Sequence, residues 1–286
     1  MRLPRHHGAA TKRRAAIRAL TGSSTARFRA ADTVAVVSVL AMAAALTGCG
    51  SGATKTTGSG EISGTITVFA AASLTETFTT LGHDFEAAHP GTKVIYSFGA
   101  SSALAQQIRQ GAPADVFASA APANMQQVVD SGDVTANPAT FASNRLEIAV
   151  PRGNPGKITG LADFGRPEPR IALCAVQVPC GAAADKVFQL AGITPQPDTR
   201  EQDVKAAVTK VTLDEVDAAL VYRTDVRSAG GKLEGIDFPE SSKVINTYPI
   251  APLAKAPNAA AATVFVDFVR SDRAKRVFAE AGFDTP

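Results

Sequence analysis

The chain of 286 residues has few of the side chains that metal sites and catalytic sites most often use. It contains four histidines, three cysteines and no tryptophan. Only His83 and His89 lie beyond the first seven residues. No group of His, Cys, Asp and Glu in the sequence has the spacing of a metal site, so we expect no metal held directly by side chains.

A basic surface of the kind that binds nucleic acid is also missing from most of the chain. Residues 1–48 hold eight of the 29 Lys and Arg residues but only one of the 26 Asp and Glu residues. Removal of this segment would change the net charge from +3 to about −4. Because phosphate backbones need a positive electrostatic footprint, no nucleic-acid partner is expected.

The N-terminal segment has the pattern of a secretory signal. A basic region precedes the apolar run at residues 34–46, which is too short to span a bilayer permanently. The run ends in Leu-Thr-Gly-Cys at residues 46–49, which resembles the lipobox of bacterial lipoproteins. We therefore expect a lipoprotein signal peptide at residues 1–48 and a lipidated Cys49. An ordinary signal peptide with a chance cysteine is the alternative. Residues 49–61, rich in Ser, Gly and Thr, predict a flexible tether.

If Cys49 is lipidated, Cys174 and Cys180 are the only cysteines left to pair. Export permits a disulfide between them, and closure of so small a loop would contribute about 2 kcal/mol at best. Two unpaired buried thiols are the alternative, because the sequence does not establish the Cβ geometry that a disulfide needs.

From residue 62 onward, strand-like and helical patterns alternate. Strands are predicted at residues 65–70, 93–98, 115–119, 146–150, 171–175 and 218–222. Helices are predicted at residues 73–88, 102–110, 181–191, 203–211, 259–269 and 272–281. This alternation favours an α/β fold with a mostly parallel sheet. The 238 residues after the signal suit two lobes of a little over a hundred residues each.

Four segments follow or lie near predicted strands and open predicted helices. They are residues 70–73 (Ala-Ala-Ala-Ser), 99–102 (Gly-Ala-Ser-Ser), 178–181 (Val-Pro-Cys-Gly) and 203–204 (Asp-Val). None has a cationic side chain at its tip, so they predict an anion held by neutral N–H and O–H donors at the carboxyl ends of strands. Ser73 and Glu76 also fit a capping box, in which Ser73 would cap a helix and Glu76 would accept from the Ser73 backbone N–H.

The segment Gly99 to Ala103 approximates the nucleophile elbow of serine hydrolases, with Ser101 at its centre. That chemistry needs a histidine base, which follows the serine in the chain of such enzymes. His83 and His89 both precede Ser101. An exported serine hydrolase is therefore a remote alternative, and we expect no enzyme activity.

Several longer stretches resemble the molybdate-binding proteins of bacterial ABC transporters. They are residues 67–75 (TVFAAASLT), 97–108 (SFGASSALAQQI), 111–117 (GAPADVF), 178–181 (VPCG), 203–205 (DVK), 220–225 (LVYRTD) and 248–250 (YPI). The resemblance covers residues 62–283, and the set in this order is far more specific than any one piece. It implies a type II periplasmic-binding-protein fold, in which two crossover strands join two α/β lobes around a ligand cleft. Lobe I would comprise residues 62–143 plus 245–286, and lobe II residues 144–244.

The same resemblance implies the residues that bind the oxyanion: Ser73, Ser101, Cys180, Val204 and Tyr222. The two serines would give hydroxyl and backbone N–H groups, Cys180 and Val204 their backbone N–H groups, and Tyr222 its hydroxyl. Better-known members carry alanine at the Cys180 position, a change that a backbone donor tolerates. Without the resemblance, Val204 would be assigned to an apolar helix stripe and Tyr222 to the core.

The expected function is capture of molybdate or tungstate outside the cytoplasm and delivery to an ABC permease. The protein would be a monomer without a cofactor, anchored to the outer face of the membrane by Cys49. An acceptor-only tetrahedral dianion suits an all-donor site, whereas hydrogenphosphate would leave its own O–H unpaired at a cost of about 1–3 kcal/mol. Sulfate has the same charge and also carries no proton, so only the size of the cavity could exclude it. A receptor for another oxyanion such as sulfate, or for a small organic acid, is the open alternative.

Overall fold

The computed structural model describes residues 62–286. The expected signal peptide, Cys49 and the tether lie outside these residues. The strands are β1 (Gly64–Ala71), β2 (Thr92–Gly99), β3 (Val116–Ala118), β4 (Ala139–Pro151), β5 (Ile171–Cys174), β6 (Thr199–Glu201), β7 (Ala218–Tyr222), β8 (Leu233–Ile236) and β9 (Ile245–Pro252). The α-helices are α1 (Thr75–Ala88), α2 (Ser101–Arg109), α3 (Pro122–Asp130), α4 (Pro179–Ala191), α5 (Val204–Thr212), α6 (Arg223–Ser228), α7 (Ala259–Val269) and α8 (Asp272–Ala281).

The strands hydrogen-bond in the order β2-β1-β3-β9-β4-β7-β5-β6, and β8 pairs with β4. In the first part of this order, β1 is parallel to β2 and β3, while β3 is antiparallel to β9. In the second part, β5 is parallel to β6 and β7, while β7 and β8 are antiparallel to β4. The sheets are therefore mixed rather than mostly parallel.

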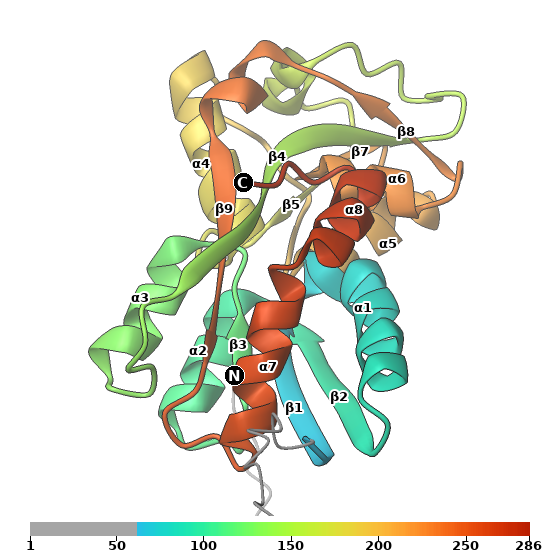
Figure 1. The fold of residues 1–286 in the computed structure, drawn as a ribbon. Coiled ribbons are helices and arrows are strands. Elements are labelled where there is room, and N and C mark those ends of the chain that lie inside the picture. The colour runs from blue at the N-terminus through green and yellow to red at the C-terminus, as the bar shows by residue number, and fades with distance from the viewer. Residues whose placement is uncertain (1–61) are drawn as a thin grey trace, which may run out of the picture. The chain divides into compact units, whose positions relative to one another are not determined.

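Two long strands, β4 and β9, run between the lower and upper parts of Figure 1. They pair antiparallel between residues 139–145 and 245–250. Beyond residue 145, β4 leaves β9 and pairs with β7 and β8. This arrangement is the predicted one of two α/β lobes joined by two crossover strands. The lobe boundaries at residues 143/144 and 244/245 stay a prediction, and we keep the names lobe I and lobe II for these ranges.

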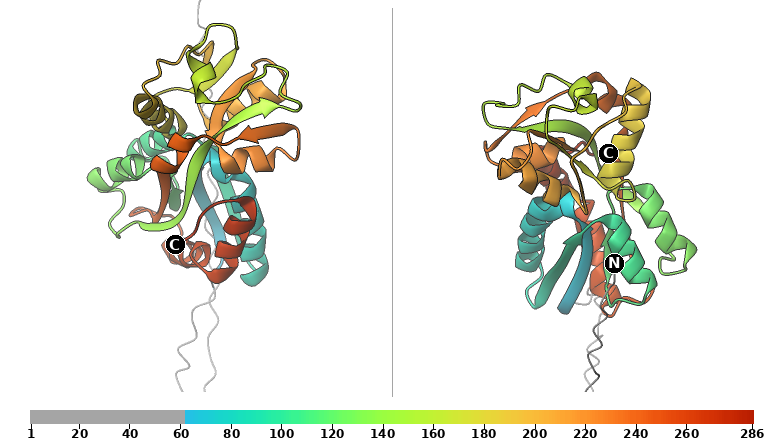
Figure 2. Two further views of the ribbon diagram at one scale, coloured as in Figure 1. Left: turned by 90° about the horizontal axis from the view of Figure 1, so that it is seen from above. Right: turned by 180° about the vertical axis from the view of Figure 1, so that it is seen from behind.

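Side chains that alternate along β1 divide the core of lobe I between two faces of its sheet. Val68 and Ala70 pack in one apolar cluster with Phe78 of α1 and Phe265 of α7, whereas Phe69 packs in another cluster with residues of α2 and α3. The three-layer arrangement of this lobe can be followed from behind in Figure 2. Lobe II has its own apolar cluster, built on β4, β5 and β7. Each lobe thus has a separate core.

Several elements differ from the sequence-based expectation. The predicted helix at residues 73–88 begins instead as a 3-10 turn at Ala72–Leu74, and α1 starts at Thr75. Strand β4 begins at Ala139 rather than near residue 146. Its first half carries half-buried polar residues because it crosses between the lobes, and this weakens the apolar pattern of a strand. Of the helices in residues 62–286, none has both the length and the apolar character needed to cross a membrane.

Candidate functional site

A small cavity lies where residues of lobe I meet residues of lobe II. Its lining residues are Ala72, Ser73, Ala100, Ala120, Val178, Pro179, Cys180, Asp203, Val204 and Tyr222. Its volume is about 20 Å³, which accommodates little more than one water-sized group. The two lobes are therefore closed on each other in this structure.

Three helix N-termini converge on this cavity, together with the 3-10 turn that follows β1. Ala100 is the N-cap of α2, Val178 is the N-cap of α4, and Asp203 is the N-cap of α5. The first N–H groups of a helix have no partner within the helix, and its dipole favours negative charge at that end. The Asp203 carboxylate accepts from Ala206 N at 3.0 Å, so this acidic side chain is used to cap α5.

Four of the five predicted binding residues line the cavity: Ser73, Cys180, Val204 and Tyr222. Ser101 is fully buried directly after Ala100, and its Oγ accepts a hydrogen bond from Ala120 N at 2.9 Å. Ala100 and Ala120 both line the cavity, so Ser101 lies immediately behind its wall. The structure thus brings all five residues to one place, although they are spread over 150 positions of the sequence.

The predicted capping box of Ser73 and Glu76 is wrong. Leu74 is the N-cap of α1, and no side chain caps it. The 3-10 turn moves the start of α1 past Ser73, whose Oγ instead lies 3.0 Å from the Tyr248 hydroxyl of β9. Glu76 forms an ion pair with Lys205 of α5 instead of accepting from the Ser73 backbone N–H. Tertiary contacts therefore replace the local cap that the sequence pattern indicated.

The hydroxyl groups at the cavity are neutral donors and acceptors. Tyr222 and Tyr248 are almost fully buried, and burial raises the pKa of both phenols. The Tyr222 hydroxyl accepts from Asn246 Nδ2 at 2.9 Å. Because both phenols stay protonated at neutral pH, each keeps one hydrogen to donate.

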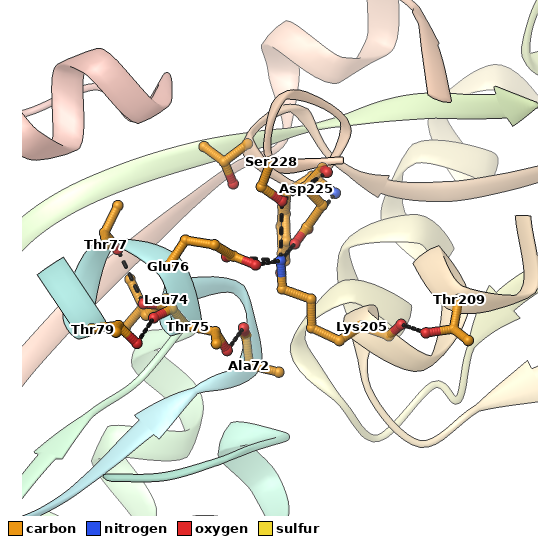
Figure 3. A network of polar contacts seen from close by, with 12 residues as sticks. Ala72, Leu74, Thr75, Glu76, Thr77, Thr79, Lys205, Thr209, Asp225 and Ser228 are labelled. Carbon is orange, nitrogen blue, oxygen red and sulfur yellow. Dashed lines mark hydrogen bonds and ion pairs between the residues drawn. The ribbon is translucent and has the colours of Figure 1, made fainter. Parts of the chain in front are cut away.

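Lys205, which follows the lining residue Val204, is neutralised by acidic groups (Figure 3). Lys205 Nζ lies 2.8 and 2.9 Å from the two Glu76 carboxylate oxygens, 3.1 Å from Asp225 Oδ1 and 3.2 Å from Ser228 Oγ. Burial lowers the pKa of Lys205, but the nearby Asp225 and Glu76 outweigh it and raise that pKa overall. Since Glu76 belongs to α1 and Lys205 to α5, this ion pair joins the two lobes.

The loop between β5 and α4 is shaped by a disulfide and a glycine. The structure joins Cys174, at the end of β5, to Cys180, in the first turn of α4, with their Cα atoms 5.8 Å apart. A Cβ atom on Gly181 would lie 1.9 Å from the Ala175 carbonyl oxygen, so only glycine fits there. These two features hold the first turn of α4, with the lining residue Cys180, beside the cavity.

A larger surface hollow of about 370 Å³ lies elsewhere in lobe II. Arg152, Arg170, Asp214, Asp217 and Lys232 contribute to its walls. Arg170 is already paired with Asp217 at 2.9 Å, and no helix N-terminus opens into the hollow. In residues 62–286, no group of His, Cys, Asp and Glu could hold a metal ion. The small cavity between the lobes is therefore the candidate site.

Comparison with known proteins agrees with this geometry. The family described as bacterial extracellular solute-binding protein matches residues 66–284. The chain belongs to this family. This solute-binding protein is 39% identical over 247 residues to the molybdate-binding protein ModA of Mycobacterium tuberculosis, a match that covers 86% of this chain and 95% of that protein. The predicted resemblance to molybdate-binding proteins is confirmed.

Two solved structures show that the fold is shared. The periplasmic molybdate-binding protein of Azotobacter vinelandii has a TM-score of 0.66 and 22% identity, covering 77% of this chain and 99% of its own. The sulfate-binding protein SubI of M. tuberculosis also has a TM-score of 0.66, with 20% identity and coverage of 77% and 86%. The type II periplasmic-binding fold is thus confirmed, but the fold does not select between these two anions.

Family membership makes this chain an extracytoplasmic solute-binding protein and not an enzyme. The serine hydrolase alternative is wrong. The structure gives the physical reason at Ser101, whose Oγ is paired with the Ala120 backbone N–H and not with an imidazole.

Several residues around the cavity carry no signal in the sequence. Asn246 contacts the Tyr222 hydroxyl, Ala120 contacts Ser101, and Lys205 reaches Glu76 across the lobes. Tyr248 was part of a stretch that resembles the family, but nothing in the sequence connected it with Ser73. These pairs are separated by 19 to 175 residues, so no local pattern could have revealed them.

Proposed function

We propose that this protein captures molybdate, and tungstate equally, and delivers it to the membrane permease of an ABC transporter. One observation carries the proposal: helix N-termini and neutral hydroxyls from both lobes converge on a single small cavity. The similarity to ModA proteins supports molybdate as the anion. The oxyanion is the cargo of the protein, and the molybdenum would be held through its oxygens.

The proposed donors come from both lobes. Ser73 and Ser101 would each give a hydroxyl and a backbone N–H, Cys180 and Val204 would each give a backbone N–H, and Tyr222 would give its hydroxyl. Four of these residues line the cavity, and the fifth lies directly behind it. Charge-assisted hydrogen bonds of this kind contribute about 1.5–3 kcal/mol each when water is excluded.

The composition of the cavity favours a compact anion without protons. Asp203 is the only ionisable acid among the lining residues, and its carboxylate caps α5. Molybdate and tungstate have the same charge and nearly the same size, so the site would treat them alike.

The finer details of cell location and assembly are also proposals. Cys49 would carry a lipid that holds the protein at the outer face of the cell membrane, with residues 49–61 as tether. The protein would act as a monomer made of lobe I (62–143 plus 245–286) and lobe II (144–244). A Cys49→Ala variant should move from the membrane fraction to the soluble fraction, whereas retention in the membrane would contradict the anchor.

Calorimetric titration of the processed chain, residues 49–286, tests the function. We expect saturable binding of molybdate and tungstate, much weaker binding of sulfate and the weakest binding of phosphate. Small-angle X-ray scattering in parallel should show a more compact particle on addition of molybdate. Tighter binding of sulfate than of molybdate would assign the protein to the alternative class of receptor.

A further inference from the structure

Each hydroxyl assigned to the anion has a single hydrogen. Besides the anion, each hydroxyl would also have a polar neighbour within the protein. The Tyr222 hydroxyl lies 2.9 Å from Asn246 Nδ2, Ser101 Oγ lies 2.9 Å from Ala120 N, and Ser73 Oγ lies 3.0 Å from the Tyr248 hydroxyl. An anion that only accepts hydrogen bonds needs all three hydrogens. The hydroxyl oxygens must therefore act as acceptors toward their protein neighbours.

Asn246 settles this direction for Tyr222. The Asn246 side chain, on crossover strand β9, is almost fully buried. Its Nδ2 also donates to the Ala120 carbonyl oxygen at 3.0 Å. A carbonyl oxygen can only accept, so the amide nitrogen and not the amide oxygen must face it. The same nitrogen faces the Tyr222 hydroxyl, which is consequently an acceptor in that contact.

The Tyr222 hydrogen is thereby excluded from the side of Asn246. A phenolic hydrogen lies near the plane of the ring and has two positions. The remaining one can serve a group in the cavity or the neighbouring Tyr248 hydroxyl. Ser101 is constrained in the same way, because a backbone N–H can only donate. The Ala120 residue connects the two arrangements, since its N–H donates to Ser101 and its carbonyl accepts from Asn246.

We propose that Asn246 is a positioning residue that determines specificity, because its amide denies the Tyr222 hydrogen one of its two positions and so favours donation into the cavity over acceptance from an anion that carries a proton. This inference rests on the proposed function, in which Tyr222 binds the oxyanion. A protonated anion such as hydrogenphosphate needs an acceptor in the cavity, and the hydrogen bond from Asn246 already occupies one acceptor site of the Tyr222 hydroxyl. Asn246 itself does not line the cavity, so it acts through Tyr222.

The test is a double-mutant cycle with Asn246→Leu and Tyr222→Phe in the processed chain, titrated with molybdate and with phosphate. Leucine has a similar size but cannot donate. We expect Asn246→Leu to weaken molybdate binding at least fivefold, and the double variant to bind molybdate no more weakly than Tyr222→Phe alone. The ratio of molybdate to phosphate affinity should also fall at least fivefold in Asn246→Leu and should not fall further when Tyr222→Phe is added.

Asn124→Leu is the matched control, because Asn124 is equally buried in lobe I and makes no hydrogen bond to the three hydroxyls. It should leave both affinities unchanged. Thermal unfolding of each variant identifies a general loss of structure, which would lower the affinities for molybdate and phosphate together and leave their ratio unchanged. A purely structural role of Asn246 would give that result and overturn the inference.

Two further outcomes would also overturn it. One is wild-type affinity in Asn246→Leu, and the other is an equal loss from Asn246→Leu with and without Tyr222→Phe. In both cases the proposed function stands if the wild-type chain binds molybdate. A wild-type chain that binds none of the oxyanions would overturn the proposed function and this inference with it.

Discussion

The two lobes face the cavity with different chemistry. Lobe I presents the side chains of Ser73 and, behind the wall, Ser101, whereas lobe II presents the first turns of α4 and α5. In the proposed site, lobe I gives two hydroxyls and two backbone N–H groups, and lobe II gives two backbone N–H groups and the Tyr222 hydroxyl. A side-chain donor is lost with one substitution, but a backbone donor persists unless the main chain moves. Truncation of Ser73 or Ser101 in lobe I should therefore weaken binding, whereas α4 and α5 of lobe II should be sensitive mainly to changes that move the main chain.

The largest effect is expected from a change that moves the main chain of lobe II. Gly181→Ala would place a Cβ atom 1.9 Å from the Ala175 carbonyl oxygen, so the first turn of α4 must shift and carry the Cys180 N–H with it. Molybdate affinity should fall about a hundredfold by calorimetry, at the upper range for loss of one charge-assisted bond. Ala182→Ser, at an exposed position in the same turn, is the control. Equal affinity in the two variants would contradict the backbone role of this turn.

Removal of the hydroxyls tests lobe I. Ser73→Ala and Ser101→Ala should each weaken molybdate binding at least about tenfold, because each removes one charge-assisted hydrogen bond. Ser101→Ala also leaves the Ala120 N–H without its partner, so its free energy of unfolding should fall by about 1–3 kcal/mol. Calorimetry and urea unfolding measure the two quantities. Unchanged affinity in both variants would show that the serines are not donors.

The contact between the lobes should have a moderate effect. Glu76→Gln removes the negative charge with which Lys205 pairs across the lobes. A second contact between the lobes remains, because Arg223 of lobe II still donates to the Gly282 carbonyl oxygen of lobe I. Exposed ion pairs contribute up to about 1 kcal/mol, so we expect about a two- to threefold faster release of molybdate in stopped-flow measurements.

Asp84→Asn is a close control for Glu76→Gln. Asp84 also lies on α1, but its partner Arg273, at 2.8 Å, belongs to lobe I. An acid lost within one lobe should leave molybdate release unchanged. If both variants release molybdate at the same rate, the Glu76–Lys205 pair does not hold the lobes together.

A smaller effect on binding is expected where lobe II donates through its backbone alone. Val204→Ala keeps the N–H at the start of α5 and removes buried apolar surface. Molybdate affinity should stay within about twofold of wild type, while the free energy of unfolding falls by about 1–2 kcal/mol. A large loss of affinity without loss of stability would mean that the Val204 side chain itself contacts the ligand.

The smallest effect is expected from pH. A phenol donates only while protonated, and burial raises the pKa of Tyr222 and Tyr248, so the loss of these donors moves to higher pH. Molybdate affinity should be constant between pH 7 and about 9.5, near the ordinary pKa of tyrosine. A decrease within this range that disappears in Tyr222→Phe would show that Tyr222 ionises more readily than its burial allows.

Prediction from the sequence succeeds for the α/β fold, for most strands and helices, and for five of the residues that meet at or directly behind the cavity. Its success depended on short segments such as residues 70–73 and 178–181, where a strand ends and a helix begins, and on their similarity to one family. It failed at Ser73 and Glu76, because a local capping motif competes with distant partners that the sequence does not reveal. It also missed Asn246, whose role depends on Ala120 and Tyr222, which are distant in the chain.

The bond between Cys174 and Cys180 has a practical consequence for how the protein is made. The bond lies in the same turn as a proposed ligand contact, so thiol chemistry and anion capture share one short stretch of chain. Material folded under reducing conditions would have a looser α4 start than material secreted into an oxidising environment. The two preparations should differ in their affinity for molybdate, and incubation of the first with an oxidant should convert it into the second.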